Sequence, residues 1–197
     1  NGTIGTYRIV AKNDDGCTRE IGTFTLLSQP NSNYVISTNN DPACAGVDHV
    51  IRLSGSQAGF TYKLIQNGTT TVNTVTGTGG LIELGTTSVA GTYTVLINNG
   101  GCEVSNTGSL NIVALPDNIP VVPGNYCEGD DVVIRLNSSQ DGAIYRLFRN
   151  GVLYGSEVVT GNGNPIVFSD KFPDGTYTVR ASFAAGACER QMTGVVV

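Results

Sequence analysis

The chain has 197 residues, of which 40% are hydrophobic and 14% are charged, with a formal net charge of −5 at pH 7. This length allows one large domain or two small ones, and the apolar fraction is ordinary for a folded protein and too high for a disordered tail. The acidic charge and the scattered Lys and Arg residues argue against nucleic acid as a partner, and the absence of any long apolar run argues against direct membrane insertion.

A short phrase that begins Gly-Thr-Tyr occurs three times, as GTYRIVAKNDDGC from residue 5, GTYTVLINNGGC from residue 91 and GTYTVRASFAAGAC from residue 175. Other runs keep the same phase: CAGVDHVIRLSGSQAGFTYKLIQNG (44–68) matches CEGDDVVIRLNSSQDGAIYRLFRNG (127–151), and GTGGLIEL (77–84) matches GNGNPIVF (161–168). The sequence therefore predicts a repeat of about 85 residues.

Three segments follow from this period, with boundaries in the Pro-containing stretches 27–33 and 114–120. Residues 1–28 are predicted to be the last two strands of a truncated module. Residues 29–114 and 115–197 are predicted to be two complete modules.

Within each complete module, apolar and polar residues alternate with period two, which is typical of strands with one buried face. In chain order, the first module is predicted to contain strands near 34–38, 48–54, 60–66, 70–76, 81–84, 91–98 and 103–113. The second is predicted to contain strands near 120–122, 131–137, 143–149, 152–160, 165–168, 175–183 and 189–197. Seven short strands per module indicate an all-β fold of tandem immunoglobulin-like sandwiches with little or no helix.

The tyrosine of each Gly-Thr-Tyr phrase lies in the apolar phase of its strand. Tyr7, Tyr93 and Tyr177 are therefore predicted to fill the core, with the hydroxyl bonded to nearby backbone as in the tyrosine corner of such sandwiches.

The five cysteines also follow the repeat. Pairing within modules predicts one disulfide each, Cys44 with Cys102 and Cys127 with Cys188, and leaves Cys17 unpaired because its partner would precede residue 1. A competing phase joins Cys17 to Cys44 and Cys102 to Cys127, which would staple neighbouring modules and leave Cys188 free. Either phase implies an oxidising, extracytoplasmic setting.

The matching runs, together with AGTYTVLINNGGC and the strand SNTGSLNIV, resemble the Ig-like repeats of very large surface proteins of Bacteroidetes, including gliding-motility adhesins that carry type IX secretion signals. Residues 5–30 are similar to the closing part of the repeats of the gliding adhesin itself. The resemblance implies a filament on the bacterial cell surface that works in adhesion. The C-terminal secretion domain expected of such proteins is not among these 197 residues.

No pattern indicates an enzyme or a cofactor. The single histidine, His49, is predicted to be a surface or edge residue at the start of a strand, and no Cys/His cluster has zinc-ligand spacing. The acidic pairs Asp14–Asp15 and Asp130–Asp131 are not repeated intact between modules and indicate ordinary turns rather than calcium sites, although a linker site that uses Asp117 stays open.

The sequence thus predicts a non-enzymatic stalk segment whose first partners are neighbouring repeats of the same chain. The alternative is a module that binds a surface polysaccharide or a protein, or an accessory domain of a large secreted enzyme. Because an isolated hairpin is marginal in water, residues 1–28 are expected to be completed by further chain or to self-associate with another edge.

Overall fold

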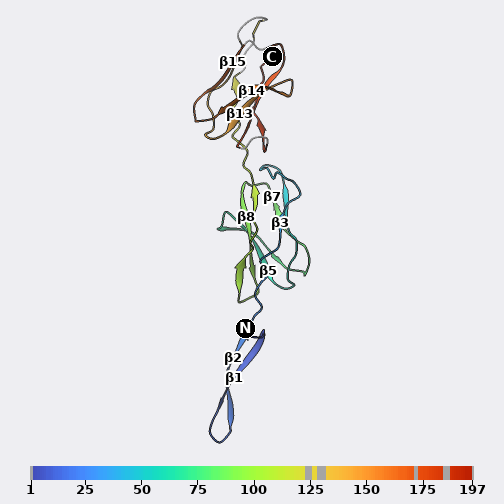
Figure 1. Ribbon diagram of the computed structural model, residues 1–197, viewed down its shortest axis with the longest axis vertical. Coiled ribbons are helices and arrows are strands. Elements are labelled where there is room, and N and C mark those ends of the chain that lie inside the picture. The colour runs from blue at the N-terminus through green and yellow to red at the C-terminus, as the bar shows by residue number, and fades with distance from the viewer. Residues whose placement is uncertain (1, 123–125, 128–131, 171–172, 184–186, 197) are drawn as a thin grey trace. The chain divides into compact units, whose positions relative to one another are not determined.

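The computed structural model describes residues 2–122, 126–127, 132–170, 173–183 and 187–196. These residues form strands, turns and loops without a helix (Figure 1). No segment in the described ranges is a helix that could cross a membrane. The prediction of an all-β fold is confirmed.

Backbone contacts divide the chain into two compact units. Unit 1 comprises Asn1–Asn39, His49–Thr87 and Thr92–Asn111. Unit 2 comprises Asn40–Asp48, Ser88–Gly91 and Ile112–Val197, so it includes two loops from the sequence of the first repeat.

Unit 1 opens with an antiparallel hairpin of β1 (Gly5–Lys12) and β2 (Thr18–Leu26). Two sheets follow. The smaller has the order β3 (Ile36–Ser37), β4 (His49–Leu53) and β7 (Ile82–Thr87). The larger has the order β10 (Leu110–Ile112), β8 (Gly91–Asn98), β5 (Thr61–Gln66) and β6 (Thr70–Thr76), with β9 (Glu103–Ser105) also paired to β8.

Unit 2 repeats this topology. Its smaller sheet has the order β11 (Val121–Val122), β12 (Val132–Leu136) and β15 (Ile166–Asp170). Its larger sheet has the order β14 (Val152–Thr160), β13 (Ile144–Arg149), β16 (Tyr177–Ser182) and β17 (Arg190–Gln191). A three-stranded sheet facing a four-stranded sheet is an immunoglobulin-like sandwich, as predicted.

Each sandwich has a core because alternate residues of both sheets point inward. In β8, Tyr93, Val95 and Ile97 are fully buried, whereas the residues between them are half-buried. In unit 2 the buried cluster takes side chains from both sheets: Val121, Ile134, Leu136, Ile166 and Phe168 from the smaller, and Tyr145, Leu147, Tyr177, Val179 and Ala181 from the larger.

The last predicted strand of the first module, 103–113, is divided into β9 and β10. Asn106 causes the interruption because its buried side chain bonds to another part of the backbone: Oδ1 accepts from the Tyr34 N–H at 3.2 Å, and Nδ2 donates to the Tyr34 carbonyl at 2.8 Å. The Asn106 amide thus takes the place of a strand residue beside Tyr34.

The hairpin of β1 and β2 exposes apolar side chains whose counterparts in the first repeat are buried. Ile9 is 46% exposed and Leu26 is 38% exposed, whereas Val95 and Ile112, which occupy the corresponding positions, are 0% and 1% exposed. Tyr7 stacks on Phe24 with ring centroids 5.0 Å apart. The hairpin therefore carries the inner face of a sandwich without a covering sheet in the described chain.

Candidate functional site

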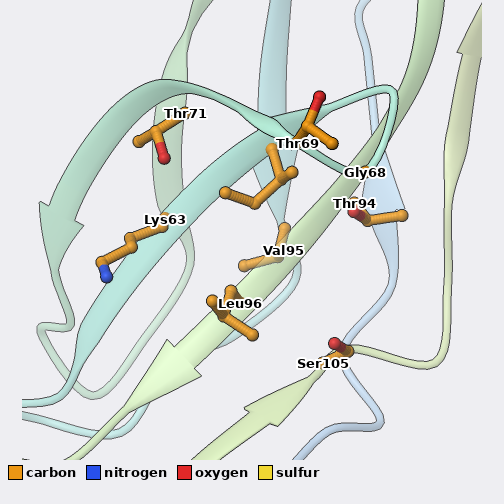
Figure 2. A pocket seen from close by; sticks show the side chains of 9 residues that line it. Lys63, Gly68, Thr69, Thr71, Thr94, Val95, Leu96 and Ser105 are labelled. Atoms are coloured by element: carbon orange, nitrogen blue, oxygen red, sulfur yellow. The ribbon is translucent and has the colours of Figure 1, made fainter.

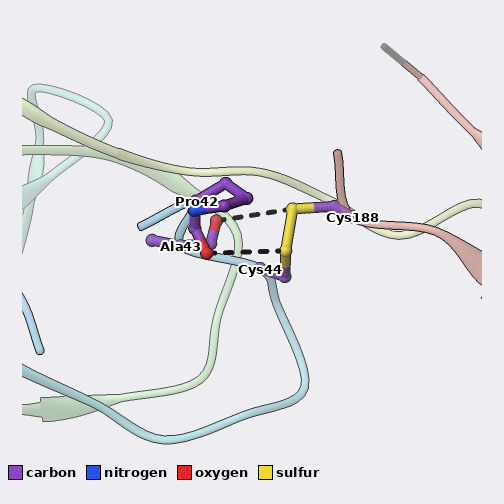
Figure 3. The surroundings of a disulfide bond; sticks show 4 residues. All are labelled: Pro42, Ala43, Cys44 and Cys188. Carbon is purple, nitrogen blue, oxygen red and sulfur yellow. Dashed lines mark hydrogen bonds between the residues drawn. A yellow bond between two sulfur atoms is a disulfide. The ribbon is translucent and has the colours of Figure 1, made fainter. Parts of the chain in front are cut away.

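A disulfide joins Cys44, in the sequence of the first repeat, to Cys188, in the sequence of the second (Figure 3). Both cysteines belong to unit 2, their Cα atoms are 5.2 Å apart, and 144 positions separate them in the sequence. The disulfide lies against backbone, since the sulfur of Cys188 is 3.7 Å from the carbonyl oxygen of Ala43. Cys188 is buried.

This connectivity corrects both predicted phases. Cys44 is not bonded to Cys102, Cys188 is not bonded to Cys127, and the thiols of Cys17 and Cys102 are free. Cys17 and Cys127 are exposed, and Cys102 is half-buried.

The length of β8 explains why Cys44 and Cys102 do not pair. The loop after Cys44 is held just before β8, where the Gly46 N–H donates to the Ser88 carbonyl at 2.8 Å. Cys102 follows the end of β8, which is eight residues long. Such a strand spans about 26 Å, whereas bonded cysteines need Cα atoms within about 7 Å.

A second feature, which we call the linker clamp, fixes the chain where it enters each sandwich. The Gln57 side-chain oxygen accepts a hydrogen bond from the Asn31 N–H at 2.7 Å, and the Gln140 oxygen accepts one from the Asp117 N–H at 2.6 Å. Gln57 and Gln140 occupy the same position in the repeated Ser-Gln-x-Gly motif. The sequence marks the motif, but not its attachment to the linker, because that contact spans more than twenty residues.

The serine of the same motif holds a neighbouring loop. Ser56 Oγ donates to the Gly80 carbonyl at 2.6 Å and accepts from the Thr78 N–H at 3.1 Å. Ser139 repeats this pair of bonds with the Asn164 carbonyl and the Asn162 N–H. Both serines are buried, so the motif is structural in each repeat.

The three phrase tyrosines differ in their surroundings. Tyr93 and Tyr177 are buried, and Tyr7 is half-buried in the uncovered hairpin. Tyr177 donates its hydroxyl proton to the Pro173 carbonyl, and Tyr7 donates to the Thr3 carbonyl, each four residues upstream. The Tyr93 hydroxyl lies 3.2 Å from Thr87 Oγ1. Burial raises the pKa of Tyr177 above its usual value of 10.0.

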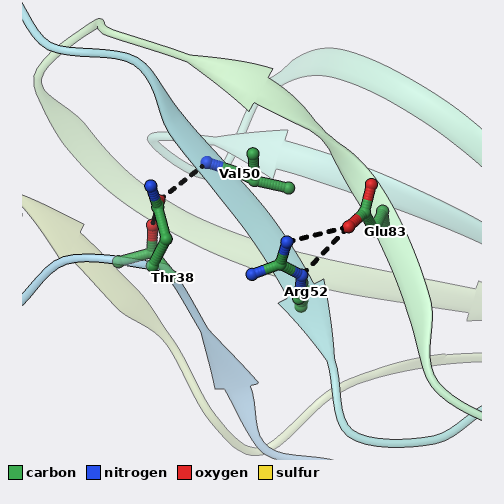
Figure 4. A network of polar contacts seen from close by, with 5 residues as sticks. Thr38, Val50, Arg52 and Glu83 are labelled. Carbon is green, nitrogen blue, oxygen red and sulfur yellow. Dashed lines mark hydrogen bonds and ion pairs between the residues drawn. The ribbon is translucent and has the colours of Figure 1, made fainter.

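His49 is 1% exposed, so the prediction of a surface histidine is wrong. The alternation of residues in β4 indicated that His49 is buried, because His49 has the same phase as the buried residues Ile51 and Leu53. Beside it, the half-buried outer face of β4 carries a polar network in which Arg52 binds Glu83 at 2.9 Å (Figure 4). The Val50 N–H donates to Asn39 Oδ1 at 3.1 Å in the same network.

The acidic residues do not gather into a metal site in the part of the chain that the structure describes, where no three His, Cys, Asp or Glu side chains converge. Asp14 and Asp15 form the turn between β1 and β2. Asp130 and Asp131 lie outside the described residues. Asp117 is exposed and its backbone N–H belongs to the linker clamp.

A shallow groove of about 340 Å³ lies on the outer face of the larger sheet of unit 1 (Figure 2). Its wall includes Lys63, the hydroxyls of Thr69, Thr71 and Thr94, and Leu96. Lys63 also pairs with Glu103 at 4.0 Å. The lining has no aromatic side chain on which a sugar ring could stack, so the groove gives little support to a carbohydrate site.

The chain matches no protein-family model and no curated protein. Among solved structures it is similar to the human OSCAR ligand-binding domain, with 17% identity and a TM-score of 0.38 over 86% of this chain and 98% of that chain. It is also similar to a segment of two fibronectin type-III domains from chicken tenascin, with 14% identity and a TM-score of 0.43 over 85% and 98% of the two chains.

A third similar structure comprises extracellular domains 3–5 of Drosophila OTK, with 14% identity and a TM-score of 0.40 over 98% of this chain and 70% of that chain. The chain is built of immunoglobulin-like repeats, as its own sheets and cores show.

Proposed function

We propose that this chain is a non-enzymatic stalk segment of a bacterial cell-surface adhesin, in which serially linked repeats give reach and resist stretching. The modules at 29–114 and 115–197 would be its repeating units. The supporting observation is the disulfide between Cys44 and Cys188, which connects the sequences of adjacent repeats. Resemblance of the repeats to those of Bacteroidetes gliding adhesins supports the setting, with export by type IX secretion and a role in adhesion or gliding.

The bond changes the path that force takes through the chain. Tension applied to the two ends passes from residue 44 directly to residue 188, so the intervening chain carries no load while the bond is intact. All strands from β4 to β16 lie wholly within this bypassed stretch. A covalent bypass of this kind suits a segment whose task is to transmit tension without lengthening.

Single-molecule stretching tests the proposal. The oxidised chain should release less contour length than the Cys44→Ser variant, and the difference should be about 500 Å because 144 residue steps stay closed. The Cys102→Ser variant is the matched control, since it removes a free thiol and should behave as the parent chain does. Equal contour lengths for the parent and Cys44→Ser chains would refute load bypass.

The alternative of a ligand-binding module makes a different prediction. Binding to a glycan array, or a melting temperature that rises with added sugar, would favour it over the stalk. Loss of that binding on Lys63→Ala substitution would assign it to the groove of unit 1.

A further inference from the structure

The observed disulfide follows a positional rule. Cys44 is the first cysteine of its repeat, and Cys188 is the second cysteine of the repeat that follows. In the first repeat, Cys102 occupies the position that Cys188 occupies in the second, after the strand that begins with Gly-Thr-Tyr. Cys102 is half-buried and its thiol is free.

The structure shows how the first cysteine is held. Cys44 lies beside Val113, because the Ala45 N–H donates to the Val113 carbonyl and the Val113 N–H donates to the Ala43 carbonyl, both at 2.8 Å. Val113 directly precedes the linker into the second repeat. In the first repeat, the first cysteine is therefore held beside the end of the closing strand.

Leu27 is the counterpart of Val113 in the opening copy, since GTFTLLSQP (22–30) matches GSLNIVALP (108–116). In unit 1, Leu27 packs against the turn that carries Cys102: its Cδ1 is 2.6 Å from the point where a Cβ on Gly101 would stand. The Asn99 side chain donates to the Ser28 carbonyl in the same contact. The residue beside which a first cysteine would be held is thus already next to Cys102.

We propose that Cys102 forms a disulfide with the first cysteine of a preceding repeat, the one that residues 1–28 close. The partner is a further copy of this module that carries a counterpart of Cys44. Every joint between repeats would then be crosslinked by the same rule. This inference rests on the serial arrangement in the proposed function.

The bond requires an oxidant, and a low-molecular-weight disulfide such as oxidised glutathione supplies it. The Cys102 thiolate attacks one glutathione sulfur and releases the first glutathione thiolate. The thiolate of the preceding first cysteine then attacks the Cys102 sulfur and releases the second. Two thiols lose two protons and two electrons, and one oxidised glutathione becomes two reduced molecules.

The test replaces residues 1–4 of the chain by a copy of residues 29–90, which completes the opening copy up to its Gly-Thr-Tyr phrase at Gly5. The protein is refolded with reduced and oxidised glutathione, alkylated and digested without reduction. We expect a peptide that joins the added counterpart of Cys44 to Cys102, with Cys102 alkylation falling at least tenfold and the Cys44–Cys188 peptide retained. A bond from the added cysteine to Cys17, or full alkylation of Cys102 beside an intact Cys44–Cys188 bond, would overturn the proposal.

Two variants of the extended chain serve as controls. Serine at the added cysteine should restore alkylation of Cys102, and Cys102→Ser should leave the added cysteine alkylated. If the extended chain fails to fold, the Leu27→Cys variant of the original chain tests whether Cys102 can form a bond at this joint. A Leu27→Cys bond to Cys102 in oxidised glutathione would support the joint, and its absence would refute it. The stretching experiment concerns Cys44 and Cys188 in the original chain, so failure of this inference is distinguishable from failure of the stalk.

Discussion

At the scale of single residues, Tyr62 and Tyr145 show how one side chain fixes a loop and a core together. Both are fully buried, and both hydroxyl oxygens accept a hydrogen bond from a backbone N–H five residues upstream, from Gln57 at 2.7 Å and from Gln140 at 2.8 Å. The ring belongs to the core, while its oxygen orients the glutamine that clamps the linker. Replacing either tyrosine therefore affects packing and linker attachment at once.

Burial raises the pKa of Tyr62 above 10.0, although the bond from the Gln57 N–H acts in the opposite direction. The unfolded chain releases this proton near pH 10, while the folded chain retains it to higher pH. The contribution to stability is therefore complete below about pH 10 and is lost as pH rises through the folded pKa. Urea unfolding between pH 8 and 11.5 should show a flat free energy of unfolding up to about pH 10 and a decline above it.

The Tyr62→Phe variant is the check on this assignment. It should be less stable at neutral pH because the Gln57 N–H loses its acceptor, and its alkaline decline should be shallower. An unchanged slope would show that Tyr62 does not cause the decline.

At the scale of elements, two glycines allow loops to approach the core closely. A Cβ on Gly77 would stand 2.2 Å from the Gln57 carbonyl oxygen, and a Cβ on Gly161 would stand 2.1 Å from that of Gln140. The same positions lie 2.8 and 3.0 Å from the rings of Tyr62 and Tyr145. No L-side chain fits there without moving the backbone.

We expect Gly77→Ala to lower the free energy of unfolding by roughly 1–3 kcal/mol, because the obstructing atoms are backbone and a packed ring. Gly80→Ala is the matched control in the same loop, since a Cβ there meets nothing within 4 Å. Its effect should stay within about 0.5 kcal/mol. Chemical denaturation measures both, and equal losses for the two variants would contradict the argument.

The linker clamp makes a local prediction of its own. Gln57→Ala removes the acceptor of the Asn31 N–H, so hydrogen exchange at that amide should speed up several-fold. The Asp117 amide, which binds Gln140, should exchange at its parent rate and serves as the internal control. Exchange that rises at both amides would indicate general destabilisation rather than a released linker.

At the scale of the whole molecule, the disulfide is the long-range constraint. It closes a loop of 144 positions, for which the chain-entropy estimate is about 5 kcal/mol. Cys44→Ser should lower the free energy of unfolding by several kcal/mol, measured by urea titration without reductant. Cys102→Ser, which removes a free thiol, should cost far less. Similar losses in both variants would show that the bond does not stabilise the folded chain.

Sequence patterns predicted the strands well where the alternation of apolar and polar residues and the turn residues indicated the same strand boundaries. The bounds of β6, β8 and β14 are those expected from the repeats. The division of the last predicted strand into β9 and β10 at Asn106 was not predictable, because the partner of Asn106, Tyr34, is 72 positions away in the sequence.

The cysteine pairing failed for a similar reason. The period placed Cys44 in phase with Cys127 and Cys102 in phase with Cys188, but it gave no information about which end of the sandwich each cysteine occupies. The distance along β8 decides that point, and the structure was needed to show that the loop of Cys44 is held just before this strand.

The turns after β5 and β13 have a consequence for chemical ageing. Each contains an Asn-Gly step in the left-handed region, with φ of 51° at Asn67 and 48° at Asn150. Such steps normally deamidate when the following amide nitrogen attacks the side-chain carbonyl. Here both carboxamide oxygens accept backbone hydrogen bonds, from Thr92 at 3.0 Å and from Thr176 at 2.9 Å. Held in this way, the two asparagines should survive long exposure that would convert free Asn-Gly peptides to isoaspartate.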